Sequence, residues 1–179
     1  MKKTALSPTL VFLISAALLL LSCSSSEPEN SALTDGLMLK YIHSAPYLDE
    51  STGTYTFKKT GKNKYEVMIE KDDKERKEVL DGNFRFVDGI AKNTTLTVVG
   101  GGIVWISPDG LSENTVPDHH VMELTRKNGY SAYKLKYELV DGCYSYYEEE
   151  TGILVATEQH VDKDVVHTRL VATNAGDLQ

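Results

Sequence analysis

Residues 130–156 read YSAYKLKYELVDGCYSYYEEETGILVA, and this stretch predicts the fold more clearly than any other part of the chain. Apolar and polar residues alternate over residues 133–139, which is the pattern of a β-strand with one buried and one solvated face. Asp141-Gly142 then favours a two-residue type I′ turn, because both central positions of that turn need a positive φ. Pattern, propensity and turn chemistry agree, so we expect a β-hairpin here.

The register of that hairpin predicts a cluster of tyrosines on one side of the sheet. A two-residue turn pairs Tyr137 with Tyr146, and Tyr133 and Tyr144 then fall on the same face. Six of the chain's ten tyrosines lie in residues 130–147. These rings could simply fill the core. The opposite face also carries apolar residues, so one face could instead contact a ligand or a partner; those residues are Val140, Cys143, Tyr147, Ile153 and Val155.

Strand and turn patterns continue on both sides of the hairpin. Residues 37–45 fit either a helical stripe or a strand, and the β-rich sequence that follows favours a strand. Asp81-Gly82 indicates another hairpin tip. The fold class we expect is all-β, a single curved antiparallel sheet (a half-barrel or open-barrel meander) of about eight to ten strands with little or no helix after the N-terminal segment. The Asp81-Gly82 hairpin covers residues 79–87, and the remaining strands are predicted at 54–59, 64–71, 94–99, 103–106, 121–126, 153–159 and 165–172.

The N-terminal segment has the three features of a secretory signal. Two lysines are followed by an almost wholly apolar run at residues 10–21, too short to span a membrane, and then by Ser22 and Cys23. The junction resembles a bacterial lipobox, which implies lipidation of Cys23; the alternative is an ordinary signal peptide. We therefore expect a signal peptide at 1–22, a lipidated tether at 23–36 and a β domain at 37–179.

Localisation follows from this segment. A lipidated Cys23 would hold the protein on a membrane of the cell envelope through acyl chains. Ser24 rather than an aspartate follows the cysteine, which resembles outer-membrane sorting in species with two membranes. We therefore expect the membrane to be one partner of the chain.

Composition limits the other classes of partner. The net charge of −7 becomes more negative by two when Lys2 and Lys3 are removed, so a nucleic acid partner is not expected. The chain is long enough for one domain with a real core. It has two cysteines, and a lipidated Cys23 would leave Cys143 without a disulfide partner, as a small, partly buried apolar side chain.

The motifs of enzymes and cofactor sites are not found in the sequence. The five histidines have no metal-ligand spacing, because adjacent His119 and His120 would point to opposite sides of a strand. The three glycines at 100–102 precede no helix and no Lys-Ser/Thr, so they indicate a β-corner rather than a phosphate loop. No Gly-x-Ser-x-Gly elbow occurs. We predict no metal, no cofactor and no enzymatic activity.

Two motifs resemble LolA-like proteins, which include outer-membrane lipoprotein carriers and looser relatives among envelope lipoproteins. One is Trp105-Ile106-Ser107-Pro108, and the other is the run YYEEETGIL at residues 146–154. The resemblance covers residues 103–174. It implies a strongly curved antiparallel half-barrel around an apolar cavity that holds acyl chains. The chain departs from the family in lacking the helices that cover the cavity in the carriers.

Two functional hypotheses follow. The first is a membrane-anchored, non-catalytic module that binds an acyl chain or another apolar ligand. Its candidate ligand-binding residues are Tyr133, Leu135, Tyr137, Tyr144, Tyr146 and Leu154. The alternative is a structural or interaction lipoprotein that docks a protein partner through its sheet face or edge.

Overall fold

The computed structural model describes residues 35–175, and the predicted signal peptide and Cys23 lie outside the described residues. One antiparallel sheet of nine strands makes up the fold, in the order β4-β3-β2-β1-β9-β8-β7-β6-β5, as the sequence predicted. None of the helices in residues 35–175 has the length and hydropathy needed to cross a membrane. The strands are β1 (Met38–Ser44), β2 (Ser51–Gly61), β3 (Lys64–Lys71), β4 (Lys74–Asp81), β5 (His119–Lys127), β6 (Tyr130–Tyr137), β7 (Cys143–Glu148), β8 (Leu154–Val161) and β9 (Asp164–Thr173).

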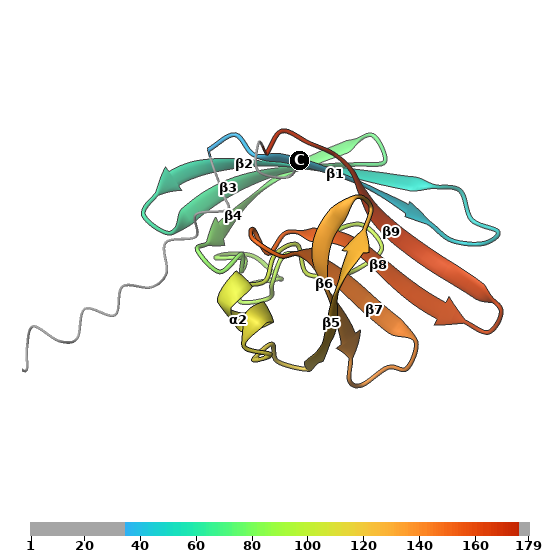
Figure 1. The fold of residues 1–179 in the computed structure, drawn as a ribbon. Coiled ribbons are helices and arrows are strands. Elements are labelled where there is room, and N and C mark those ends of the chain that lie inside the picture. The colour runs from blue at the N-terminus through green and yellow to red at the C-terminus, as the bar shows by residue number, and fades with distance from the viewer. Residues whose placement is uncertain (1–34, 176–179) are drawn as a thin grey trace, which may run out of the picture.

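Two meanders, β1–β4 and β5–β9, build this sheet. Within each meander, consecutive strands pair as antiparallel neighbours, and the pairing of β1 with β9 joins the two. Figure 1 shows that the joined sheet curves strongly, so that the two meanders form the two wings of an open half-barrel. The curved sheet predicted from the hairpin pattern is therefore confirmed.

The segment that connects β4 to β5, residues 82–118, enters the concave side of the sheet. It contains the short helix α2 (Pro108–Ser112) and a few isolated β-bridges rather than regular strands. Phe84 stacks on Trp105 with 5.4 Å between ring centroids, and its ring also packs edge-on against Phe57 of β2. The buried apolar residues of the segment are Phe84, Phe86, Leu96, Val98, Val99, Val104, Leu111 and Val116. This segment packs its apolar side chains against the concave face of the sheet.

The inner faces of β1–β3 supply a second part of the core, and residues of β6–β9 complete it. Along β3, every second side chain is buried, so Tyr65, Val67 and Ile69 share the inner face as their alternation predicted. Tyr41 of β1 is fully buried, and its hydroxyl donates to the carbonyl oxygen of Leu154 at 2.9 Å. Each such side chain contributes roughly 1.5–3 kcal/mol by leaving water. The apolar alternation therefore determines which face of the sheet packs against residues 82–118.

The predicted hairpin over residues 79–87 is present, since the Val87 N–H donates to the Val79 carbonyl oxygen at 3.0 Å, but the two-residue turn predicted at Asp81-Gly82 is wrong. β4 pairs along its whole length with β3, and an isolated bridge joins Leu80 to Phe86. The Asp81 carboxylate accepts hydrogen bonds from the backbone N–H groups of Asn83 and Arg85, both at 2.9 Å. This side-chain-to-backbone bonding stabilises a wider turn, because an aspartate can close a turn on its own backbone.

The predicted type I′ turn at Asp141-Gly142 is also wrong. The β6–β7 connection is a five-residue loop, residues 138–142, and the register places Tyr133 opposite Tyr147 and Lys136 opposite Tyr144. This register differs from the predicted one by an odd number of residues. The side chains of β7 therefore lie on the opposite face of the sheet from the one predicted relative to β6. The inner face gains Tyr147, whose hydroxyl donates to the Ile103 carbonyl oxygen. That contact with a distant segment outweighs the local preference of the turn.

We predict that Gly152 is the least replaceable of the turn glycines. Its φ is +68°, and a Cβ there would collide with the Ile106 carbonyl oxygen and lie 3.2 Å from Pro108 Cδ. Gly129 also has a positive φ, +87°, but nothing lies within 4 Å of its added Cβ. We expect Gly129→Ala to cost about 1–2 kcal/mol for backbone strain alone, and Gly152→Ala to cost about 3 kcal/mol or more.

Urea denaturation of both variants tests this order. Equal losses of unfolding free energy would contradict the close approach between Gly152 and Ile106.

Candidate functional site

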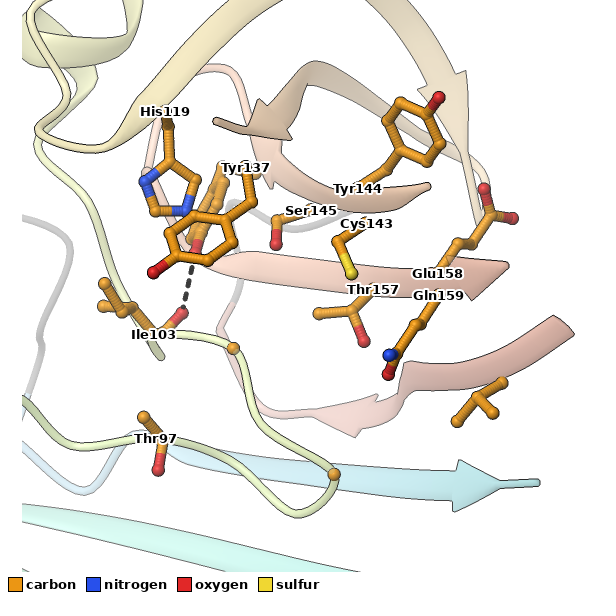
Figure 2. Close-up of a pocket in the computed structure, with 14 residues that line it drawn as sticks. Thr97, Ile103, His119, Tyr137, Cys143, Tyr144, Ser145, Thr157, Glu158 and Gln159 are labelled. Atoms are coloured by element: carbon orange, nitrogen blue, oxygen red, sulfur yellow. Dashed lines mark hydrogen bonds between the residues drawn. The ribbon is translucent and has the colours of Figure 1, made fainter. Parts of the chain in front are cut away.

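A pocket of about 320 Å³ lies between residues 97–103 of the connecting segment and the inner face of β6–β9 (Figure 2). Strands β5 to β9 and the connecting segment all contribute to its wall. Because those parts are far apart in the sequence, only the folded chain brings them together. The lining residues are Thr97, Gly100, Gly102, Ile103, His119, Tyr137, Cys143, Tyr144, Ser145, Tyr147, Thr157, Glu158, Gln159 and Val166.

Hydrogen bonds fix the connecting segment against the sheet at two places. Tyr147 of β7 donates from its hydroxyl to the Ile103 carbonyl oxygen at 3.1 Å, as the dashed line in Figure 2 shows. Thr168 of β9 donates from Oγ1 to the Val99 carbonyl oxygen at 3.3 Å. The His43 Nδ1 atom lies 3.0 Å from the same Oγ1, whose proton is already used, so His43 donates to it. These contacts hold the pocket open as a defined shape.

The lining is partly apolar and partly polar. Apolar surface comes from Ile103, Val166 and the rings of Tyr137 and Tyr147. Within residues 35–175, the side chains of Thr97, Thr157 and Gln159 have no hydrogen-bonding partner. Figure 2 shows Thr157 and Gln159 close together on β8. An apolar wall with a few convergent polar groups is the usual composition of a small-molecule site.

The reactive side chains of the pocket are not arranged as a nucleophile with its base. His119 packs against Tyr137 with 5.1 Å between ring centroids, and its Nδ1 atom donates to the Pro117 carbonyl oxygen at 2.8 Å. In the part of the chain that the structure describes, no hydrogen bond joins Cys143 to a histidine or a carboxylate. Nor do three or more potential metal ligands gather anywhere in residues 35–175. Within residues 35–175 the pocket therefore has no nucleophile hydrogen-bonded to a base.

The six predicted ligand-binding residues do not share one face. Tyr137 lines the pocket, whereas Leu135 and Leu154 are fully buried in the core and Tyr133 packs half-buried against it. Tyr144 borders the pocket, but Figure 2 shows its ring turned away. The Lys134 ammonium lies 4.7 Å from the centroid of that ring. The predicted shared face is therefore wrong, because it followed from the incorrect turn.

Tyr146 lies on the outer face and helps to hold the β5–β6 hairpin. Its hydroxyl donates to the Glu158 carboxylate at 2.6 Å, and the Lys127 ammonium forms a salt bridge with the same carboxylate and lies 4.7 Å from the Tyr146 ring centroid. The neighbouring Asn128 donates to the Val155 carbonyl oxygen at 2.9 Å. The hairpin tip therefore bends over the outer face of β7 and β8 and covers the buried Ala156.

Two titrating groups of this cluster are shifted by their surroundings. Burial raises the pKa of Tyr146, and the adjacent Glu158 carboxylate raises it further. Burial alone would raise the pKa of Glu158, but the hydrogen bonds from Lys127 and Tyr146 and the positive charge of Lys127 outweigh it. The pKa of Glu158 therefore lies below its ordinary value of 4.5.

Sequence reasoning missed most of the pocket. Thr97 and Ile103 come from the connecting segment, and Gln159 and Val166 flank the turn between β8 and β9. The glycines at 100–102 were the available signal: all three have a positive φ, and they bend the segment at the pocket wall. No local pattern indicates which strands such a bend will face.

Comparison with known proteins gives weak likenesses. No family model and no curated protein matches the chain. The structure of MucB in complex with MucA(peri) is similar with a TM-score of 0.42 and 14% sequence identity, over 81% of this chain and 54% of that one. This chain thus spans about half the length of that MucB chain. A LolA superfamily protein from Nitrosomonas europaea is similar with a TM-score of 0.30 and 13% identity, over 81% of this chain and 88% of that one.

We predict that Glu158→Gln makes the protein less stable at pH 7 and weakens its acid dependence. The folded pKa of Glu158 is below the unfolded one, so its stabilisation is complete above about pH 4.5 and is lost as the pH falls through the folded pKa. Urea midpoints are measured at pH 7 and at successive pH values below 4.5. As the pH decreases, the midpoint of Glu158→Gln should fall less steeply than that of the wild type.

Glu150→Gln is the matched control, because Glu150 is an exposed turn residue. An identical acid dependence for Glu158→Gln and wild type would show that the Lys127–Glu158–Tyr146 cluster does not hold the hairpin tip.

Proposed function

We propose that the protein is a non-catalytic binding module that holds one acyl chain, or an apolar ligand of similar size, in the pocket beside residues 97–103. The observation that carries this proposal is the amphipathic lining, in which Thr157 and Gln159 offer unused hydrogen-bonding groups next to an apolar wall. A ligand with an apolar body and a polar end complements such a wall. The same class of ligand is implied by the sequence resemblance.

The volume of the pocket limits the ligand to one chain. Residues 82–118 fill most of the concave side, and the pocket beside residues 97–103 measures about 320 Å³, at the lower end of the range of small-molecule sites. Burying roughly ten methylenes at about 0.8 kcal/mol each gives about 8 kcal/mol, and an association cost of about 4 kcal/mol leaves about 4 kcal/mol, which corresponds to a dissociation constant of about 1 mM. The module therefore suits reversible holding rather than permanent storage.

Each part of the lining has a role in this proposal. Ile103, Tyr137, Tyr147 and Val166 would contact the apolar body. The exposed Gln159, at the end of β8, would donate to or accept from the polar end of the ligand. Of the sequence-predicted ligand residues, Tyr137 keeps a direct role, and Leu135 and Leu154 support the wall from the core.

Membrane anchoring through a lipid on Cys23 is part of the proposal. Residues 35 and 36, the last of the predicted tether, lead into the start of β1, where the Met38 N–H donates to the Asn174 side chain at 2.7 Å, beside the end of β9. The pocket lies towards the other end of these strands, since Val166 is near the start of β9. A lipid on Cys23 would thus leave the pocket free of the anchoring membrane. That membrane would belong to the cell envelope, and it would be the outer membrane in a species that has two.

Docking of a protein on a sheet face or edge has less support. Residues 82–118 cover the inner face, and the β5–β6 hairpin tip covers part of the outer face. The edge strand β4 is largely charged, and the other edge strand, β5, has an irregular register at residues 121–123. Charges and bulges are features that discourage pairing with a further strand.

The pocket proposal predicts that Cys143→Trp abolishes ligand binding while Cys143→Ala preserves it. The half-buried Cys143 lines the pocket, so an indole there would fill it, whereas a methyl group would not. Titration of the lipid-free Cys23→Ala protein with dodecanoic acid and a displaceable apolar dye measures this. In that protein Cys143 is the sole thiol, and bound dodecanoic acid should slow its alkylation by iodoacetamide.

Urea midpoints of both Cys143 variants show whether the pocket or the fold has changed. A folded wild type that binds no dye and alkylates at the same rate with and without dodecanoic acid would overturn the pocket proposal.

The anchoring proposal predicts that Cys23→Ala releases a folded protein from the membrane. Residues 24–31 consist of serine, glutamate, asparagine and one proline, a composition that does not favour packing into a core, so we expect the substitution to leave the urea midpoint unchanged. Detergent phase partitioning should place wild type in the detergent phase and Cys23→Ala in the aqueous phase. Aqueous partitioning of both proteins would contradict lipidation.

A further inference from the structure

Three loops at one end of the sheet each combine exposed apolar residues with acidic ones. They are the β1–β2 loop (residues 45–50), the β6–β7 loop (138–142) and the β8–β9 turn with its flanking residues (161–164), and we call them together the acidic loop end. Figure 1 shows the three loops on the same side of the molecule, away from the point where residue 35 enters the sheet. The same composition therefore occurs three times at one end.

The apolar side chains of the acidic loop end are large and strongly exposed. Tyr47 is 96% exposed, Leu48 71% and Leu139 74%, and Val140 and Val161 are also exposed. The strand order places the three loops two strand spacings apart, so their tips form a row with steps of about 10 Å. Single exposed apolar residues are ordinary, but a row of them on neighbouring loops is typical of an interaction surface.

The charges around this row are almost all negative. Six carboxylates stand against the single Lys163: those of Asp49, Glu50, Glu138, Asp141, Asp162 and Asp164. Asp141 is paired with Lys136 at 2.8 Å. In residues 35–175, no ion pair neutralises Asp49, Glu138, Asp162 or Asp164. The row of apolar tips is therefore set in a negative field.

We propose that the acidic loop end docks a basic protein segment whose apolar side chains recur about every 10 Å. Tyr47, Leu48, Leu139 and Val140 provide the apolar contacts, and the unpaired carboxylates select lysine and arginine. An anionic lipid surface or a second copy of this acidic chain would meet like charge. This surface needs neither a ligand in the pocket nor a lipid on Cys23, so it goes beyond the proposed function.

A defined peptide pair tests the charge and apolar requirements together. A fluorescent 14-residue amphipathic helix of leucine and lysine is about 21 Å long, which matches the row of loop tips. Fluorescence anisotropy should show that this peptide binds the lipid-free Cys23→Ala protein and that binding weakens as the salt concentration rises. The matched peptide of leucine and glutamate should show no binding.

Matched variants separate docking from attraction to net charge. Leu48→Ser/Leu139→Ser and Asp162→Asn/Asp164→Asn should each weaken binding about tenfold, a change of about 1.4 kcal/mol. Asp88→Asn/Glu150→Asn removes the same charge outside the acidic loop end and should leave the affinity unchanged.

Equal weakening by the two charge variants would overturn the proposal, because binding would then follow net charge alone. Failure of the leucine–lysine peptide to bind would also overturn the proposal. If the lipid-free protein then co-sedimented with phosphatidylcholine vesicles, the surface would be assigned to lipid binding instead. Because no assay here reports on the pocket, failure leaves the proposed acyl-chain site unaffected.

Discussion

A curved antiparallel sheet must bury its concave apolar face, and here the connection between the two edge strands, which contains only the short helix α2, covers it. Residues 82–118 run from β4 to β5 through the inside of the half-barrel and bring their own apolar side chains with them. Phe84 lies at the centre of that contact, between Trp105 of the same segment and the aromatic residues of β2 and β3. The segment that links the two edge strands is therefore also the segment that buries the concave face of the sheet.

The same segment determines how much space remains for a ligand. An open half-barrel with a bare interior would hold several apolar chains, whereas this interior retains a pocket of about 320 Å³ beside residues 97–103. Tyr147 and Thr168 bond the segment to β7 and β9, so the size of the pocket is set by hydrogen bonds as well as by packing. The proposed capacity of one acyl chain follows directly from the way in which the fold covers its core.

Both sides of β7 and β8 are occupied from within the chain, and this explains why their sequence is apolar on two faces. The connecting segment contacts the inner side through Tyr147, and the β5–β6 hairpin tip contacts the outer side through Tyr146 and Glu158. Several of the exposed large apolar side chains lie at the loop tips, where Leu48 and Leu139 stand among carboxylates. The proposed protein-docking surface therefore lies at one end of the sheet rather than on its faces.

The sequence by itself determined the all-β class, the antiparallel sheet and the inner face of strands such as β3, because alternation of apolar residues acts locally along a strand. It also carried the lipobox resemblance at Cys23. Only the tertiary structure decided the register of β7 and hence the faces of Tyr144 and Tyr146: the local preference of Asp141-Gly142 is worth less than burying Tyr147 against Ile103. The pocket depended on the tertiary structure for the same reason. Its wall joins residues 97–103 to β5–β9, and contacts between segments so far apart leave no periodic mark in either one.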